Sequence, residues 1–377
     1  MHTGSIGWIK AAILVALSGS LLVSANPEFD PQDFPKHHVV CPAVKRIPNN
    51  EAIKISLSYV NINPKANQTL LMIHGWPGLW STWARQIEEF KSSYHLIIPD
   101  LRGFGESTHP GDVRASNTMG DLAGDLTCIL KDAHVSSAIC VGHDWGAQLC
   151  YESARMRPDI FTAVVGAVVP YIPSAGEFVP VNALTGAFPK LTYQLYFDSK
   201  TDAATAELDR DIRRSIRSTL RSVDSPPPAD FLTSPDSFLG AWSDVKTIPP
   251  VPFLSSKEED YMVQQYRKQG FKYTFEFYTT EDRNGSWALA QIQGNFSVPQ
   301  PVLAIYPTGD PVANWSAAAE LLHSQTFTPN AEVETLGGAH WVHIENPKKF
   351  NKIVRKWLEK LDAQKIDSLE DRAEDEL

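Results

Sequence analysis

The sequence predicts an α/β fold in which a mostly parallel, doubly wound sheet carries a helical lid inserted between two of its strands. Short, continuous apolar runs alternate with longer helix-compatible segments, which is typical of strand-helix-strand units. The alternation stops between residues 171 and 294 and then resumes. A chain of 377 residues is also long enough for one large domain with an insertion and a full hydrophobic core.

The first half of the chain contains most of the expected strands. After an irregular, proline-rich lead over residues 27–48, residues 53–59 alternate apolar and polar side chains as a half-buried strand would. Continuous apolar runs, which indicate strands buried on both faces, follow at residues 70–73, 95–98, 138–141 and 163–169. The expected helices between them cover residues 82–91, 119–131 and 146–156.

The insertion divides the expected core into two segments, residues 26–170 and 295–365. Residues 171–294 are rich in proline, aromatic and charged residues and include a helix-like stretch at 201–222. Two last strands are expected at 301–306 and 331–335, a final amphipathic helix at 347–361 and an acidic tail at 366–377. We expect the insertion to form a lid over the carboxyl edge of the sheet, where ligands bind in open α/β sheets.

Both ends of the chain contain candidate targeting signals. Residues 1–25 predict a cleaved signal peptide, because Lys10 precedes an apolar run and small residues follow this run. The alternative is an uncleaved anchor, although the run at 11–23 is shorter than the roughly 20 helical residues that cross a bilayer. The terminus Glu374-Asp375-Glu376-Leu377 resembles an ER retrieval signal with Glu374 in place of the basic residue, so secretion and ER retention both stay open.

Sequons and cysteines also bear on the secretory pathway. Candidate N-glycosylation sites, which matter only if the chain enters that pathway, are Asn67, Asn284, Asn295 and Asn314. The four cysteines are too few for a disulfide framework, and three of them lie in apolar surroundings that predict buried small hydrophobic side chains. One bridge is compatible with an oxidising compartment, and the sequence does not say which of Cys41, Cys128, Cys140 and Cys150 would form it.

The charge distribution indicates the class of partner. The formal charge is −10, and no cluster of lysine and arginine occurs. This balance argues against nucleic acid or anionic lipid and favours a small-molecule partner.

A turn that suits a nucleophile follows the strand expected at residues 138–141. In Gly142-His143-Asp144-Trp145-Gly146, glycines stand two residues before and two after Asp144. A strained strand-to-helix turn needs this spacing to pack tightly and to expose its central side chain. A carboxylate is suited to displacing a leaving group at an sp³ carbon, which leaves an alkyl ester that water must hydrolyse.

Two later motifs supply a base and its partner. His340, just after the last expected strand, is the predicted base, and Asp310, which follows the preceding strand, is its predicted acid. The order nucleophile, acid, histidine is that of an α/β-hydrolase triad. His343 is the competing base, although we expect it to lie within the next turn.

The chemistry also needs backbone N–H donors beside Asp144. The sequence offers Trp145, directly after the nucleophile, and Trp76, on the loop at residues 74–78 that follows an early strand. An ordinary tight turn is the alternative interpretation of that loop.

At these motifs the chain resembles the epoxide hydrolases of the α/β-hydrolase fold family. The resemblance covers about residues 40–365, and it rests on His74-Gly-Trp-Pro77, on Asp100-Leu-Arg-Gly-Phe-Gly-Glu-Ser107, on the turn around Asp144 and on Gly338-Ala-His340-Trp. It implies a cis peptide between Trp76 and Pro77, a supporting role for the 100–107 loop with no catalytic role for Arg102, and no metal or organic cofactor.

The resemblance further implies two tyrosines in the lid. Opening an epoxide produces an alkoxide, and a phenol with a pKa near 10 stays protonated at neutral pH and can donate to it. By position the two tyrosines are Tyr193 and Tyr278. The segment around Tyr278 reads Glu-Phe-Tyr-Thr where the family often has Asn-Trp-Tyr-Arg, which weakens that assignment. A packed aromatic side chain is the alternative at either position.

The sequence therefore favours hydrolysis of an epoxide to a vicinal diol through an ester on Asp144. A haloalkane or haloacid dehalogenase is the closest alternative, but it would use N–H donors for the halide, and Trp76 stands where that class has an asparagine. An esterase would need a serine in the turn. A catalytically silent, secreted binding protein on this scaffold is a third alternative, which a missing triad residue would favour; none is missing.

Overall fold

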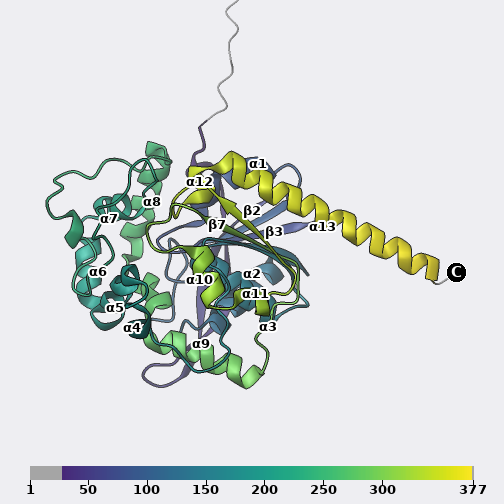
Figure 1. Ribbon diagram of the computed structural model, residues 1–377, viewed down its shortest axis with the longest axis horizontal. Helices are drawn as coiled ribbons and strands as arrows, with labels where there is room; N and C mark the ends of the chain where they lie inside the picture. The colour runs from purple at the N-terminus through teal and green to yellow at the C-terminus, as the bar shows by residue number, and fades with distance from the viewer. Residues whose placement is uncertain (1–27, 376–377) are drawn as a thin grey trace, which may run out of the picture.

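The computed structural model describes residues 28–375 and contains one eight-stranded sheet between helices (Figure 1). The strand order is β1-β2-β4-β3-β5-β6-β7-β8, where β2 is antiparallel to both of its neighbours and every other neighbouring pair is parallel. The predicted mostly parallel, doubly wound sheet is thus confirmed. The predicted signal peptide, at residues 1–25, lies outside the described residues.

Seven of the eight strands, all except β1, overlap the strands expected from the sequence. They are β1 (Lys36–Lys45), β2 (Glu51–Ile62), β3 (Thr69–Ile73), β4 (His95–Pro99), β5 (Ala138–His143), β6 (Phe161–Ala167), β7 (Val302–Pro307) and β8 (Ala331–Leu336). Every residue of β3, β4, β5 and β7 is buried, because helices cover both faces of the sheet at these strands. In β8, an edge strand, most residues are exposed.

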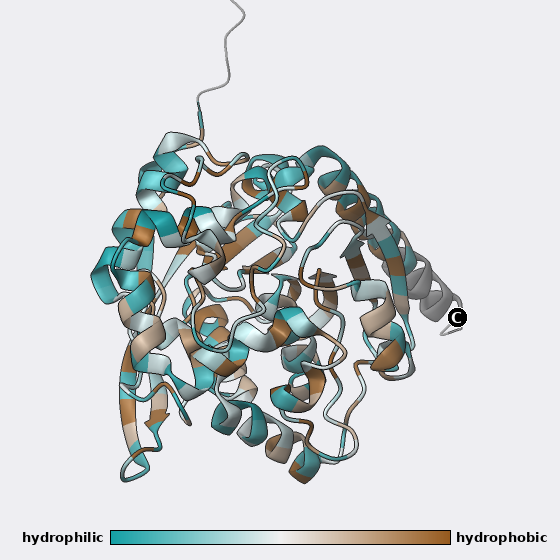
Figure 2. Cartoon of the chain, turned by 60° about the vertical axis from the view of Figure 1, so that its left-hand side comes forward, coloured by the Kyte–Doolittle hydropathy of each residue, from teal (hydrophilic) through white to brown (hydrophobic). Residues whose placement is uncertain are grey.

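The helices of the core flank this sheet. They are α1 (Ala84–Phe90), α2 (Met119–Asp132) and α3 (Trp145–Met156), followed near the C-terminus by α10 (Trp315–Leu321), α11 (Ser324–Phe327), α12 (Val342–Glu345) and α13 (Pro347–Asp375). Figure 2 shows largely hydrophobic strands at the centre and hydrophilic stretches on the peripheral helices. None of the helices within residues 28–375 has both the length and the apolarity that a bilayer-spanning segment needs.

Six helices lie between β6 and β7, within the predicted insertion. They are α4 (Val181–Leu184), α5 (Thr192–Ser199), α6 (Thr201–Asp209), α7 (Ile212–Thr219), α8 (Ser256–Gln269) and α9 (Thr280–Gln293), and a 3₁₀ helix, η5 (Lys272–Tyr278), precedes α9. Figure 1 shows α4 to α8 gathered on one side of the molecule. Indole N–H groups of the core hold this lid: Trp76 donates to Thr274 Oγ1 at 2.9 Å, and Trp80 donates to the Tyr261 hydroxyl at 2.7 Å.

Three predicted boundaries were wrong. Residues 36–45 form β1 and not an irregular lead; this strand pairs only with β2, and an edge position tolerates Pro42, which has no N–H to donate. The helix-like stretch at 201–222 is two helices, because the Asp211 side chain accepts the Arg214 N–H and starts α7 anew. The last helix continues to Asp375, through the predicted acidic tail, because no glycine or further proline ends it; Figure 1 shows it projecting beyond the body.

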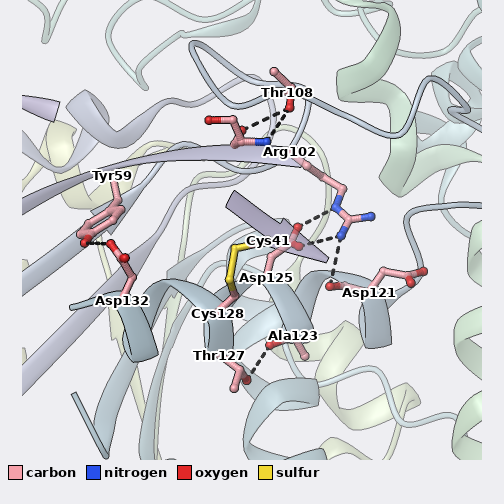
Figure 3. Close-up of a disulfide and its surroundings, with 11 residues drawn as sticks. Cys41, Tyr59, Arg102, Thr108, Asp121, Ala123, Asp125, Thr127, Cys128 and Asp132 are labelled. Atoms are coloured by element: carbon pink, nitrogen blue, oxygen red, sulfur yellow. Dashed lines mark hydrogen bonds and ion pairs between the residues drawn. A yellow bond between two sulfur atoms is a disulfide. The ribbon is translucent and has the colours of Figure 1, made fainter. Parts of the chain in front are cut away.

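The cysteines form two disulfides, which corrects the interpretation of them as free buried side chains. Cys41 of β1 pairs with Cys128 of α2 (Figure 3), and Cys140 of β5 pairs with Cys150 of α3. The Cα atoms of the two pairs lie 6.0 and 5.4 Å apart, distances at which a bridge forms without backbone movement. The first pair was not foreseen because β1 was not recognised as a strand.

A buried ion pair lies beside the Cys41–Cys128 bridge (Figure 3). Arg102 binds both carboxylate oxygens of Asp125, at 2.6 and 2.7 Å, and donates a further hydrogen bond to the Ser116 carbonyl oxygen at 2.6 Å. Both charged side chains are almost completely buried. Arg102 therefore anchors the loop that follows β4 to helix α2.

The asparagines of the four candidate sequons, Asn67, Asn284, Asn295 and Asn314, are all exposed. Asn314 also caps α10 through its side-chain oxygen, which accepts the Ala317 N–H at 3.1 Å. Their accessibility agrees with a modification at these positions, and Asn314 would keep its capping role only if its amide oxygen stayed free.

The two bridges should differ in their effect on stability. The Cys41–Cys128 bridge closes a loop with a sequence separation of 87, and the Cys140–Cys150 bridge one of 10. In the chain-entropy account, replacing the first pair by alanine should lower the free energy of unfolding by about 4–5 kcal/mol and replacing the second by about 2–3 kcal/mol. Urea unfolding of the two double variants would measure both values. A larger loss from the second pair would contradict this loop-closure account.

Candidate active site

The turn between β5 and α3 forces Asp144 into an unusual backbone conformation. Its φ and ψ angles are 55° and −124°, in a region that residues with a side chain rarely adopt. The turn is possible only with glycine on both sides. A Cβ atom on Gly142 would lie 2.2 Å from the Gly146 carbonyl oxygen, and one on Gly146 would lie 2.2 Å from the Ile73 carbonyl oxygen. The residue pattern is therefore a steric requirement of this turn.

Backbone donors hold the Asp144 carboxylate. Its Oδ1 accepts the N–H of Trp76 at 2.9 Å, and its Oδ2 lies 3.6 Å from His340 Nε2. Burial raises the pKa of Asp144 above its ordinary value, while the positive charge of His340 and the backbone N–H groups of Trp145 and Trp76 oppose this rise. The carboxylate thus faces an anion-stabilising pair of N–H groups on one side and a histidine on the other.

The loop after β3 brings Trp76 to this position. The peptide between Trp76 and Pro77 is cis, as the resemblance implied. Gly75 allows the close approach, because a Cβ atom there would lie 2.4 Å from Asp144 Oδ1. His74 connects this loop to the segment after β4, since its Nε2 accepts the Leu101 N–H at 3.1 Å.

His340 is paired with Asp310, as the sequence order predicted. Its Nδ1 lies 2.8 Å from Asp310 Oδ2. A carboxylate can only accept, so the proton is on Nδ1, and Nε2 faces Asp144. Burial alone would lower the pKa of His340, but the Asp310 and Asp144 carboxylates outweigh burial and raise this pKa.

The competing histidine occupies a different environment. His343 lies on α12, is completely buried and packs against the rings of Trp83 and His143 at 4.8 and 4.2 Å. Burial, assisted by the neighbouring His340, lowers the pKa of His343 to about 3. Asp310 therefore orients His340, and His343 is an uncharged packing residue.

Both predicted lid tyrosines line the same cavity as the Asp144 carboxylate. Tyr193 comes from α5 and Tyr278 from the end of η5, and their ring centres are 5.6 Å apart. Tyr278 also meets the rings of Trp76 and Trp145 edge-on, at 5.7 and 5.8 Å. Burial raises the pKa of both tyrosines, with a smaller contribution from the negative charge of Asp144, so both phenols keep their protons at neutral pH.

These side chains line one cavity of about 170 Å³. The remaining walls are mainly apolar and come from the lid and from the segments after β6 and β7, including Leu184, Phe188, Leu232, Phe238 and Val312. Within residues 28–375, no three or more His, Cys, Asp or Glu side chains are grouped so that they could hold a metal ion.

Comparison with known families agrees with this geometry. Residues 68–347 match the family described as the alpha/beta hydrolase fold. The chain belongs to the α/β-hydrolase fold family. The strand-turn-helix at Asp144 has the form of the nucleophile elbow of this fold, and the backbone N–H groups of Trp76 and Trp145 lie beside it as oxyanion donors would.

Individual α/β-hydrolases show further similarity. The chain is 27% identical to "Epoxide hydrolase A" of Mycobacterium tuberculosis over 321 residues, which cover 82% of this chain and 96% of that protein. It is 26% identical to the rat "Bifunctional epoxide hydrolase 2" over 317 residues, 81% of this chain, but it spans only 55% of the rat protein. The solved structure titled "Epoxide hydrolase from an endophytic Streptomyces" has a TM-score of 0.71 and 25% identity and covers 87% of this chain and 96% of that one.

The sequence had not singled out three polar residues of this α/β-hydrolase site. Trp315 donates its indole N–H to Asp310 Oδ2 at 2.6 Å. Gln194 and Arg283 line the cavity and are joined by a hydrogen bond of 3.2 Å. Gln194 could have been identified from the sequence, because it directly follows Tyr193. Nothing in the sequence indicated that Trp315 or Arg283 would lie in this site.

The two histidines should titrate very differently. We expect the pKa of His340 to lie above its ordinary value of 6.5, so that it is charged in mild acid and becomes neutral as the pH rises. In Asp310→Asn, the pKa of His340 should fall, because burial then dominates. His343 should remain uncharged across this range. NMR titration of the imidazole signals would measure both. An unchanged His340 titration in Asp310→Asn would contradict the role given to this pair.

Proposed function

We propose that this α/β-hydrolase converts epoxides to vicinal diols through a covalent ester on Asp144. The observation that carries the proposal is a carboxylate on the nucleophile elbow that faces two protonated tyrosines across an apolar cavity. A carboxylate suits displacement at an sp³ carbon, and the phenols suit a leaving oxygen that needs a proton. The epoxide hydrolases similar to the chain over most of its length support the same reaction.

In the first step, Asp144 attacks an oxirane carbon. Its Oδ1 is held by the Trp76 N–H, so the free Oδ2 is the attacking atom. A C–O bond forms to Oδ2, the strained C–O bond of the ring breaks, and the epoxide oxygen takes a proton from Tyr193 or Tyr278. The product is a hydroxyalkyl ester of Asp144, and its carbonyl oxygen, Oδ1, lies in the oxyanion hole.

In the second step, water hydrolyses this ester. Neutral His340 takes a proton from water through Nε2, and the hydroxide oxygen attacks the carboxyl carbon of Asp144. Negative charge develops on Oδ1, where the N–H groups of Trp76 and Trp145 stabilise it. The bond from the carboxyl carbon to Oδ2 then breaks, the departing oxygen takes the proton from His340, and the diol leaves with the original Oδ2. The proton that remains on the new carboxyl oxygen of Asp144 passes to the tyrosinate formed in the first step, which restores the carboxylate and both phenols.

A dehalogenase reaction has less support in this cavity. A departing halide needs N–H donors and no proton. The indole N–H of Trp76 is already bound to Thr274 at 2.9 Å, and the groups that face Asp144 from the lid are tyrosines. Haloalkanes are therefore suitable negative controls in substrate screens.

Isotope transfer tests the covalent step. In a single turnover in ¹⁸O-water with enzyme in excess, the first diol should carry an unlabelled oxygen from Asp144, since water enters the carboxylate and not the product. Asp144→Asn should abolish turnover, and His340→Gln should accumulate the ester, which mass spectrometry of the intact protein would detect. Repeated turnovers serve as the control, because label must then reach the diol. A labelled first diol would rule out the ester mechanism.

Replacing the lid phenols tests the acid. In the double variant Tyr193→Phe/Tyr278→Phe, the rate of ester formation should fall at least about 100-fold, since a positioned general acid contributes about 10²–10⁴. Rapid-quench measurement of ester formation would show this. Tyr196→Phe is a matched control, because Tyr196 is a buried tyrosine of α5 that does not line the cavity. Near-normal ester formation in the double variant would exclude the tyrosines as the acid.

A further inference from the structure

Two arginines line the cavity, and their guanidinium groups are bonded very differently. Arg221 is buried and donates to the carbonyl oxygens of Ser225, Arg217 and Pro249 at 3.0 to 3.2 Å. Arg283 makes one hydrogen bond, from Nη1 to Gln194 Oε1 at 3.2 Å. Among the described residues, no carboxylate lies within ion-pair distance of Arg283. The guanidinium of Arg221 is thus hydrogen-bonded to the surrounding backbone, whereas most N–H groups of Arg283 have no partner among the described residues.

Nearby acidic groups are already occupied. Asp198 is the carboxylate that most favours the charged form of Arg283, but its Oδ1 is 3.0 Å from Arg114 and its Oδ2 accepts the Thr280 hydroxyl. Burial lowers the pKa of Arg283 to about 10, so the group is still charged at neutral pH. The protein therefore holds a partly buried cation beside its candidate active site, and the carboxylate that most favours this charge, Asp198, is already engaged by Arg114 and Thr280.

The position of Arg283 connects it to the catalytic groups. Its guanidinium lies over the ring of Trp145, 5.8 Å from the ring centre, and Trp145 directly follows the nucleophile. Gln194, the hydrogen-bond partner of Arg283, has its amide nitrogen 3.5 Å from the Tyr193 hydroxyl. Arg283 also lines a second cavity of about 490 Å³, which shares Trp145 and Ile172 with the first. A group bound to Arg283 would lie where the two cavities meet.

We propose that Arg283 binds a carboxylate of the substrate, so that the preferred substrate is an epoxide with an apolar body and a carboxylate group. This inference rests on the proposed function and specifies its substrate class. A planar guanidinium with free donors matches a carboxylate in two parallel hydrogen bonds. The apolar walls formed by Phe188, Leu232 and Val312 suit the rest of such a molecule.

A matched pair of substrates tests the proposal. For an apolar epoxide that carries a carboxylate and for its methyl ester, the ratio of kcat/KM, acid over ester, should exceed one in the wild type. Arg283→Met should lower this ratio at least tenfold, mainly through KM, because the carboxylate is bound in both the ground state and the transition state. Arg283→Lys should keep part of the preference. Arg210→Met removes an exposed lid cation that does not line the cavity and should leave the ratio unchanged.

Two results would overturn the inference. One is an acid-to-ester ratio that Arg283→Met does not change. The other is an equal loss of kcat on both substrates, which would show that Arg283 stabilises charge on the tyrosines and does not recognise the substrate.

Binding without turnover separates this inference from the proposed function. Calorimetry should show that the wild type binds octanoate more tightly than octanamide and that Arg283→Met loses this difference. Equal affinities for the two compounds in the wild type would overturn the anion site. Failure of the wild type to open any epoxide would instead overturn the proposed function, and with it the assignment of an epoxide acid as substrate.

Discussion

The backbone at Asp144 turns from strand to helix in so little space that the surrounding residues have almost no freedom. Gly142 and Gly146 leave no room for a Cβ atom, and Gly75 lies against the carboxylate itself. This packing brings the N–H groups of Trp76 and Trp145 to the Asp144 carboxylate, Trp76 to Oδ1, while Oδ2 lies 3.6 Å from His340 Nε2. Because the donors are backbone groups, their positions are set by the sheet and do not depend on side-chain conformations. The rest of the site is arranged around this fixed point.

Core and lid contribute different parts of the chemistry. The parallel strands end at the same edge of the sheet, so the segments after β5, β7 and β8 bring together Asp144, Asp310 and His340 from distant parts of the chain. In the proposed mechanism, these groups form and hydrolyse an ester whatever the leaving group is. The lid supplies the tyrosines and Arg283, which line the cavity. In the proposals made above, these lid residues protonate the leaving oxygen and bind the substrate, so substrate choice would be set by the lid and not by the sheet.

The sequence allowed prediction of those features that depend on local patterns. Apolar runs and apolar-polar alternation identified seven of the eight strands, and the glycine spacing identified the turn at Asp144, because steric and burial requirements act over a few residues. Features that depend on tertiary contacts were missed. β1 is held by its pairing with β2 in spite of Pro42, and the Cys41–Cys128 bridge depends on that pairing. The free guanidinium of Arg283 was invisible for the same reason, since an unused donor is recognised only when every neighbouring acceptor is known.

The bridge between Cys140 and Cys150 joins the strand that enters the elbow to the helix that leaves it. Regions of a folded protein normally open and close separately, and sites with strained backbone are often among the first to open. Here the two arms of the strained turn cannot move apart while the bridge is intact. Fluctuations that open one arm must carry the other arm with them, together with the centre of the sheet. Asp144 should therefore become mobile only when the centre of the core opens, although its own backbone conformation is strained.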